Sequence, residues 1–147
     1  MKKSFTKEEY SQYVKSVLPN SNLFANIIKA FFVGGIICDI GQLIINLLKA
    51  RGLSMDMVSS ITSIIMVFLG AFLTALNVYD EIGKFAGAGS IVPITGFANS
   101  VVSPAMEFKT EGYIMGMGAK MFVIAGPVIV FGICSSVIAG IIHYFII

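Results

Sequence analysis

Long uncharged apolar runs alternate with short polar segments along most of this 147-residue chain. A membrane-spanning helix needs about 20 consecutive, mainly apolar residues, and three runs reach this length. They predict spans at residues 23–48, 57–79 and 113–145, the last with its most apolar part between Met121 and Ile142. The pattern predicts an all-α, polytopic helical membrane protein that forms a single membrane domain.

The N-terminal residues are more polar but carry a helical stripe. Apolar side chains recur there at the three- and four-residue spacing of one helix face: Tyr10, Tyr13, Val14, Val17 and Leu18. Thr6 and Glu9 form a capping box before this stripe, and Pro19 ends it. The signals predict an amphipathic helix over residues 6–18 that lies in the membrane interface, although docking on a soluble partner would use the same stripe.

Residues 85–106 carry no charge and are about long enough to cross a bilayer, yet helix-breaking residues interrupt them: Gly87, Gly89, Pro93, Gly96 and Pro104. Glycine costs about 1 kcal/mol in a helix interior and proline about 3 kcal/mol. The segment is therefore expected to form two short helices around an unwound centre. It either dips into the membrane and returns, which gives three spans, or crosses it, which gives four.

Unwound backbone at membrane depth is tolerated only where it is buried in protein or lines a water-filled cavity. Its free peptide groups, together with neutral polar side chains, can replace part of a solute's hydration. The following residues are therefore candidates for a solute pathway: Gly87, Gly89, Ser90, Pro93, Thr95, Gly96, Asn99 and Ser100. A tightly packed hairpin, whose hydroxyls bind only its own backbone, is the alternative interpretation.

Three further polar residues lie within or beside the predicted spans. Asp39 stands near the middle of the first span, Gln42 follows on the same helix face, and Lys120 lies at the entrance of the last span. A carboxylate at this depth must face protein or water, because contact with lipid would cost several kcal/mol. Cys38 and Cys134 lie in apolar runs, where small buried side chains are expected.

Composition agrees with a membrane protein, since 56% of the residues are hydrophobic and 12% charged, with a mean hydropathy of +0.90. The net charge of +2 comes from scattered residues, which argues against nucleic-acid binding. The sequence contains no recognisable catalytic motif or metal-ligand spacing, so we expect no enzyme activity, cofactor or metal site. Four lysines precede the first span and Lys29 lies in its opening turns, which favours a cytoplasmic N-terminus.

Two stretches resemble the SpoVAC/SpoVAEb family of sporulation membrane proteins, most closely its SpoVAC branch. They are FVGGIICDIGQ at residues 32–42 and, above all, YDEIGKFAGAGSIVPITGFANSVVSPAMEFKTEG at residues 79–112. The resemblance continues through GPVIVFG at residues 126–132 and covers most of the chain.

This resemblance implies a channel subunit in the spore inner membrane, in a family associated with gating by membrane tension. Because three or four spans can hardly enclose a pore, we expect an oligomer. The transported solute would be dipicolinic acid with calcium, during sporulation and germination, and the partners would include SpoVAEb and soluble SpoVAD. A non-conducting scaffold subunit is the alternative. In a path for this dianion, Asp39 would have to pair with a lysine such as Lys120, coordinate calcium transiently, or be protonated.

Overall fold

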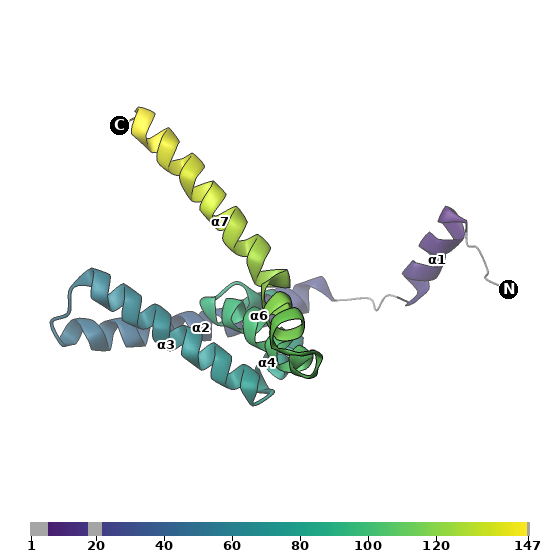
Figure 1. The fold of residues 1–147 in the computed structure, drawn as a ribbon, viewed down its shortest axis with the longest axis horizontal. Coiled ribbons are helices and arrows are strands. Elements are labelled where there is room, and N and C mark those ends of the chain that lie inside the picture. Colours follow the sequence, from purple (N-terminus) through teal and green to yellow (C-terminus); the bar gives the residue numbers. More distant parts are fainter. Residues whose placement is uncertain (1–5, 18–21, 147) are drawn as a thin grey trace.

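The computed structural model describes residues 6–17 and 22–146, and within these ranges the chain is helical and contains no strand (Figure 1). The elements in chain order are α1 (Lys7–Val17), α2 (Leu23–Ala50), α3 (Met55–Ala75), α4 (Val78–Ala86), α5 (Ala88–Ile91), α6 (Ile94–Glu107), the 3₁₀ turn η1 (Phe108–Glu111), the π-helical turn η2 (Tyr113–Gly118) and α7 (Ala119–Ile146).

Helix α1 begins as the capping box predicts. The backbone N–H of Thr6 donates to Glu9 Oε2 over 3.0 Å, and the N–H of Glu9 donates to Thr6 Oγ1 over 3.3 Å. Two donors that the first helical turn leaves unpaired are thereby satisfied. The predicted helix is confirmed through Val17, whereas the predicted contributions of Leu18 and Pro19 lie outside the described residues.

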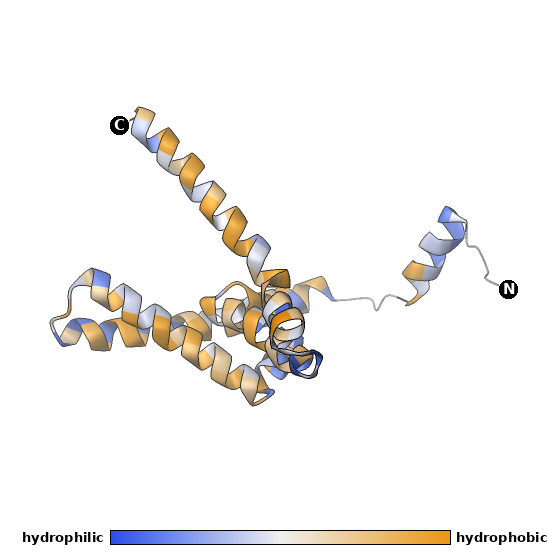
Figure 2. Ribbon diagram, viewed as in Figure 1, coloured by the Kyte–Doolittle hydropathy of each residue, from blue (hydrophilic) through white to orange (hydrophobic). Residues whose placement is uncertain are grey.

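Within the part of the chain that the structure describes, three helices are long and apolar enough to cross a membrane, which confirms the predicted fold class. They are α2, α3 and the continuous stretch from Tyr113 to Ile146 that ends in α7. Figure 2 shows apolar residues along all three, with polar residues gathered at their ends and in the segment between α3 and α7. The outer faces of α2 and α7 also carry Cys38 and Cys134, so the expected burial of these thiols is wrong.

The predicted second span is too long at its C-terminal end. Helix α3 ends at Ala75, and Asn77 adopts a left-handed conformation with φ of 58° before α4 begins. Asparagine tolerates this conformation better than most residues, so the chain can turn sharply although the sequence remains apolar. Tyr79, which we expected at the end of the span, belongs instead to α4 and is buried.

The segment at residues 85–106 is broken, as predicted. Gly87 has a φ of 52° and separates α4 from α5, and Val92 with Pro93 separates α5 from α6. Asp80 near the start of this region and Glu107 at its end line one cavity of about 450 Å³ beside the C-terminal end of α3. The start of α4 and the end of α6 therefore both lie beside the C-terminal end of α3.

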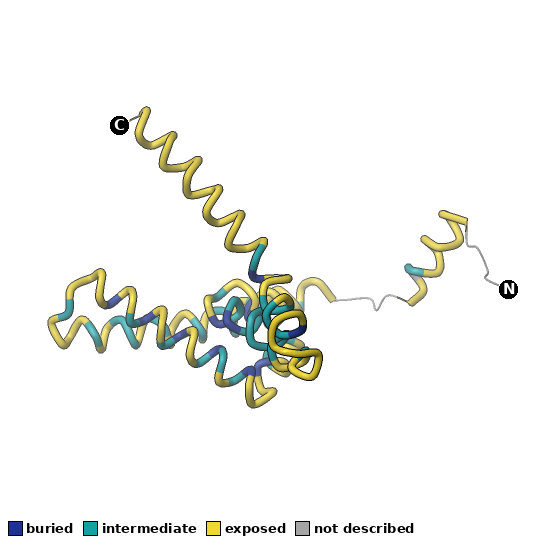
Figure 3. Tube along the Cα trace, viewed as in Figure 1, coloured by how far each residue is buried: buried dark blue, intermediate teal, exposed yellow. Residues whose placement is uncertain are grey.

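The chain reverses again between α6 and α7. Within η2, the N–H of Met117 donates to the carbonyl of Gly112 over 2.9 Å, a five-residue step that is typical of a π-helical turn. Helix α7 then packs its first turns on α6, where Ala125 is fully buried. Beyond this contact α7 projects away from α2 and α3, and its side chains are exposed (Figures 1 and 3).

One face of α3 forms the core of the described chain. Every fourth residue on it is buried: Val58, Thr62, Met66, Gly70 and Thr74. Thr62 differs from the others because its buried hydroxyl has no hydrogen-bond partner. An unpaired buried hydroxyl loses the free energy of its hydration without compensation.

The substitution Thr62→Val should therefore stabilise the fold, or at least cost nothing, because valine keeps the shape and removes the unpaired hydroxyl. A gain of about 1 kcal/mol is expected, observable as a higher midpoint of thermal unfolding in detergent. Thr74→Val is the matched control, since the Thr74 hydroxyl is bonded, and this variant should be destabilised. Equal effects of the two substitutions would contradict the prediction.

Candidate functional site

A buried tyrosine joins the two halves of the broken segment. Tyr79 Oη lies 2.7 Å from the carbonyl oxygen of Ser90 and 2.8 Å from Thr95 Oγ1. The phenol has one proton and a carbonyl can only accept, so Tyr79 donates to Ser90 and accepts from the Thr95 hydroxyl. One side chain from α4 thereby fixes both α5 and the start of α6.

Helix α6 is also tied to α3 by polar side chains. Thr74 Oγ1 lies 2.7 Å from the carbonyl oxygen of Gly70 and 2.9 Å from the amide oxygen of Asn99. The contact is close because Gly70 has no side chain. A Cβ at that position would meet the Thr95 backbone at 2.7 Å.

Two glycines of the broken segment allow similarly close backbone contacts. A Cβ at Gly89 would lie 2.7 Å from Ala30 Cα and closer still to the Ala30 carbonyl oxygen. A Cβ at Gly96 would lie 2.5 Å from the carbonyl oxygens of Ser90 and Ile91. These glycines therefore serve the packing of α5 on α2 and of α6 on α5, since real Cβ atoms do not approach backbone so closely.

A cavity of about 350 Å³ lies between α4 and the broken segment. Three of the predicted pathway residues line it, namely Ser90, Gly96 and Asn99. Tyr79, Asp80, Gly83, Lys84 and Ile91 complete the lining. Its volume falls within the range of small-molecule sites, which are about 300–1,000 Å³.

The other predicted pathway residues lie elsewhere. Gly87 borders a different cavity, beside the start of α2. Thr95 is buried and bonded to Tyr79. The Ser100 hydroxyl donates to the Phe97 carbonyl over 2.7 Å, and Pro93 is half-buried at the turn. Gly89 is buried against α2, so only part of the predicted set shares one cavity.

The charges beside this cavity are partly neutralised. Lys84 Nζ lies 2.6 Å from Glu81 Oε1, and both side chains are exposed. This bond raises the pKa of Lys84, which keeps the ammonium charged at neutral pH. Asp80 faces the same cavity. The rim therefore offers a cation and two carboxylates, with neutral polar groups behind them.

The polar residues of α2 form a separate feature. Asp39, Gln42 and Asn46 are exposed on one helix face, and Gln42 Nε2 donates to Asn46 Oδ1 over 2.9 Å. The expected pairing of Asp39 with Lys120 is not observed. Within residues 6–17 and 22–146 Asp39 forms no ion pair, and Lys120 Nζ instead lies 4.5 Å from the ring centroid of Phe108.

Sequence reasoning missed the residue that organises the site. Tyr79 was assigned to an apolar span, yet its hydroxyl holds Ser90 and Thr95. A signal was present in the sequence, because Asp80 and Glu81 immediately follow Tyr79 and mark the chain's return to water. A tyrosine at such a boundary has an apolar ring and a hydroxyl that requires a partner when buried.

Comparisons with known proteins identify the family of this chain. Residues 26–142 match the family described as SpoVAC/SpoVAEB sporulation membrane protein. The chain is 43% identical over 139 residues to stage V sporulation protein AC of Bacillus subtilis (strain 168), covering 94% of this chain and 93% of that protein. No solved structure matches the chain. By both measures, the chain belongs to the SpoVAC/SpoVAEB family of sporulation membrane proteins.

Proposed function

We propose that this protein is a subunit of a spore inner-membrane channel that moves dipicolinic acid, with calcium, during sporulation and germination. The observation that supports this proposal is the cavity between α4 and the broken segment, where Ser90, Gly96 and Asn99 lie together beside Lys84. Neutral hydroxyl and amide groups can replace part of a solute's hydration without holding the solute tightly. The Lys84 ammonium at the rim is paired with Glu81, so the proposal rests on the neutral polar groups behind it.

Assembly into an oligomer follows from the exposed polar face of α2. Asp39, Gln42 and Asn46 lie along a helix that is apolar enough to span a membrane, yet nothing in the described chain covers them. Because polar groups at this depth must face protein or water, further subunits are expected to enclose this face. Three spanning helices in one chain are also too few to surround a pore. SpoVAEb and SpoVAD are the proposed partners.

A non-conducting scaffold is the second candidate, and one observation favours it. The hydroxyls of Ser90 and Thr95 bind inside the protein, since Ser90 Oγ donates to the Gly87 carbonyl over 2.9 Å and Thr95 pairs with Tyr79. These bonds stabilise a packed hairpin whether or not a solute passes it. In this role the subunit would support the conducting SpoVA subunit.

Efflux from liposomes distinguishes the two candidates. Purified protein in dipicolinate-loaded vesicles should release the solute when membrane tension is applied by osmotic downshift. Release by this protein alone supports the channel. Release only after SpoVAEb is added supports the scaffold, and no release in either case would contradict both.

Gly83 gives a specific test of the cavity. A Cβ at Gly83 faces the cavity and meets only Ser90 Oγ, at 3.9 Å, so a side chain fits without displacing backbone. Gly83→Leu should therefore fold normally, fill part of the cavity and remove most of the dipicolinate efflux. Gly83→Ala should retain efflux and add up to about 1 kcal/mol of helix stability.

The matched control is Gly140→Leu on the exposed part of α7, where a Cβ meets nothing within 4 Å. This variant carries the same added side chain far from the cavity and should retain efflux. Normal efflux through a stably folded Gly83→Leu protein would place the solute path outside the cavity.

A further inference from the structure

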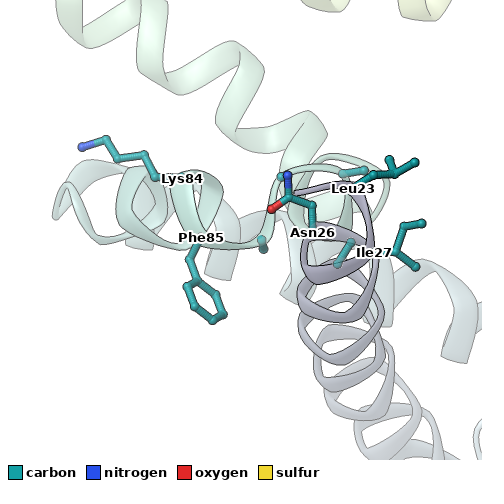
Figure 4. A pocket seen from close by; sticks show the side chains of 9 residues that line it. Leu23, Asn26, Ile27, Lys84 and Phe85 are labelled. Carbon is teal, nitrogen blue, oxygen red and sulfur yellow. The ribbon is translucent and has the colours of Figure 1, made fainter. Parts of the chain in front are cut away.

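Two cavities of different character adjoin at Phe85. The first, of about 340 Å³, lies beside the opening turns of α2 and is bordered by Asn26, Ala30 and the start of α5 (Figure 4). The second, of about 740 Å³, is an almost wholly apolar groove between α2, α3 and α4. Phe85 lines both cavities.

The two cavities lie at different depths in the membrane, one after the other along α2. The 28 residues of α2 extend about 42 Å, which exceeds the hydrocarbon thickness of about 30 Å. The first turns of α2, with Asn26, therefore lie at the headgroup boundary. The apolar groove continues deeper, from Val33 to Ile40. Its lining includes Leu69, Phe72 and Leu73 of α3.

A cation lies over the ring of Phe85, the residue that the two cavities share, although its own side chain lines neither cavity. Lys29 Nζ of α2 lies 4.8 Å from the ring centroid of Phe85, and its side chain is half-buried. Among the described residues no acidic side chain forms an ion pair with Lys29. The acidic residue that lines the groove, Glu81, is paired with Lys84. Figure 4 shows the Lys84 ammonium directed away from α2, while Asn26 extends from α2 toward the loop after Phe85.

We infer that this edge of the protein binds one anionic phospholipid. Its phosphate is held by the Lys29 ammonium and the Asn26 amide, and one acyl chain passes Phe85 into the apolar groove. The arrangement matches an amphiphile in three respects, namely an amide-bearing outer cavity, an unpaired cation over the Phe85 ring and an apolar groove at greater depth. Lysines near an anionic membrane surface attract its lipids. The inference does not depend on the transported solute.

The experiment uses tryptophan fluorescence, because the chain contains no tryptophan. Phe72→Trp places a single fluorophore in the groove. Phe131→Trp, on α7 where the native side chain is 72% exposed, reports bulk lipid. Each full-length variant is reconstituted in phosphatidylcholine vesicles with increasing fractions of acyl-brominated phosphatidylglycerol, or of acyl-brominated phosphatidylcholine as the neutral control.

At position 72, half-maximal quenching by brominated phosphatidylglycerol should require about fivefold less lipid than quenching by brominated phosphatidylcholine. The ratio should be near one at position 131. Lys29→Gln should remove the preference at position 72, and Lys29→Arg should retain it. Lys84→Gln is the matched control: Lys84 also lines the outer cavity, but its ammonium is bound to Glu81 and directed away from α2, so this variant should retain the preference.

Four results would overturn the inference, the last of them with inorganic phosphate. One is an equal preference for phosphatidylglycerol over phosphatidylcholine at positions 72 and 131. Another is an unchanged preference in the Lys29→Gln protein. The third is an absence of quenching by either lipid at position 72, which would show that protein, such as a second copy of the chain, fills the groove. Inorganic phosphate should not relieve the quenching, and if it did, the cation would be a free-anion site instead.

Discussion

Replacing Gly89 by alanine should detach α5 from α2 and is expected to have the largest effect on stability of any single methyl group added to this chain. The new Cβ would meet the Ala30 backbone, with Ala30 Cα at 2.7 Å. Backbone in the middle of a 28-residue helix cannot move aside as a flexible side chain can. We expect a loss of about 3 kcal/mol or more, at the upper end of the range for overpacked sites.

Neighbouring glycines on α2 provide matched controls for Gly89→Ala. A Cβ at Gly34 would lie 3.3 Å from the Gly89 carbonyl oxygen, so Gly34→Ala requires only a small shift. A Cβ at Gly35 meets nothing within 4 Å, and alanine is the better helix former there by about 1 kcal/mol. The order of stability should therefore be Gly35→Ala above Gly34→Ala, with Gly89→Ala lowest.

The series is measured by heating the purified variants in detergent and recording the fraction that remains monodisperse on size exclusion. A stable Gly89→Ala protein would show that α5 does not rest on α2 as the structure describes. A destabilised Gly35→Ala protein would show instead that the outer face of α2 is closely packed, which would identify a subunit contact there.

The outlines of the fold were predictable because they depend on long, repetitive signals. The apolar runs of α2 and α7 reach the length of about 20 residues that a membrane span requires. Thr6 and Glu9 form a capping box that needs no tertiary contact, so its prediction was accurate. The breaks after Gly87 and before Pro93 follow from backbone preferences that are equally local.

The site was harder to predict because its side chains are directed by contacts between elements. Ser90 and Asn99 have similar chemistry in the sequence, yet the Ser90 side chain is 1% exposed and Asn99 is half-buried. The difference arises from the positions of the helices, which the close contacts of Gly70 with Thr95 and of Gly89 with Ala30 determine. No local sequence pattern reveals these contacts. The turn at Asn77 was missed for a related reason, since apolar residues continue on both sides of it.

Asp39 shows a third reason why the sequence alone does not predict the whole site. Its place near the middle of an apolar run comes directly from the sequence, and the demand for a polar environment follows from physics alone. Within the described residues, however, Asp39 forms no ion pair. We therefore predict that another subunit covers the face that Asp39 shares with Gln42 and Asn46, and cross-linking at these positions tests this prediction.

Removing one hydroxyl from Tyr79 should have the second largest effect. Tyr79→Phe keeps the ring in its buried position but leaves the Ser90 carbonyl without this donor and the Thr95 hydroxyl without its acceptor. Unpaired buried polar groups cost about 1–3 kcal/mol, so the unfolding free energy should fall by that amount. The α4 end of the cavity would then be held only by apolar contacts, and dipicolinate efflux should change as well.

A double-mutant cycle with Thr95→Val separates the paired hydroxyls from packing effects. The coupling energy should be about 0.5–3 kcal/mol, and a value near zero would mean that the two hydroxyls do not interact. Alkaline pH gives an independent measure. Burial raises the pKa of Tyr79, although the bond from Thr95 opposes part of this increase. Above about pH 10 the unfolded chain loses this proton first, so the stability advantage of the native protein over Tyr79→Phe should shrink as the pH rises further.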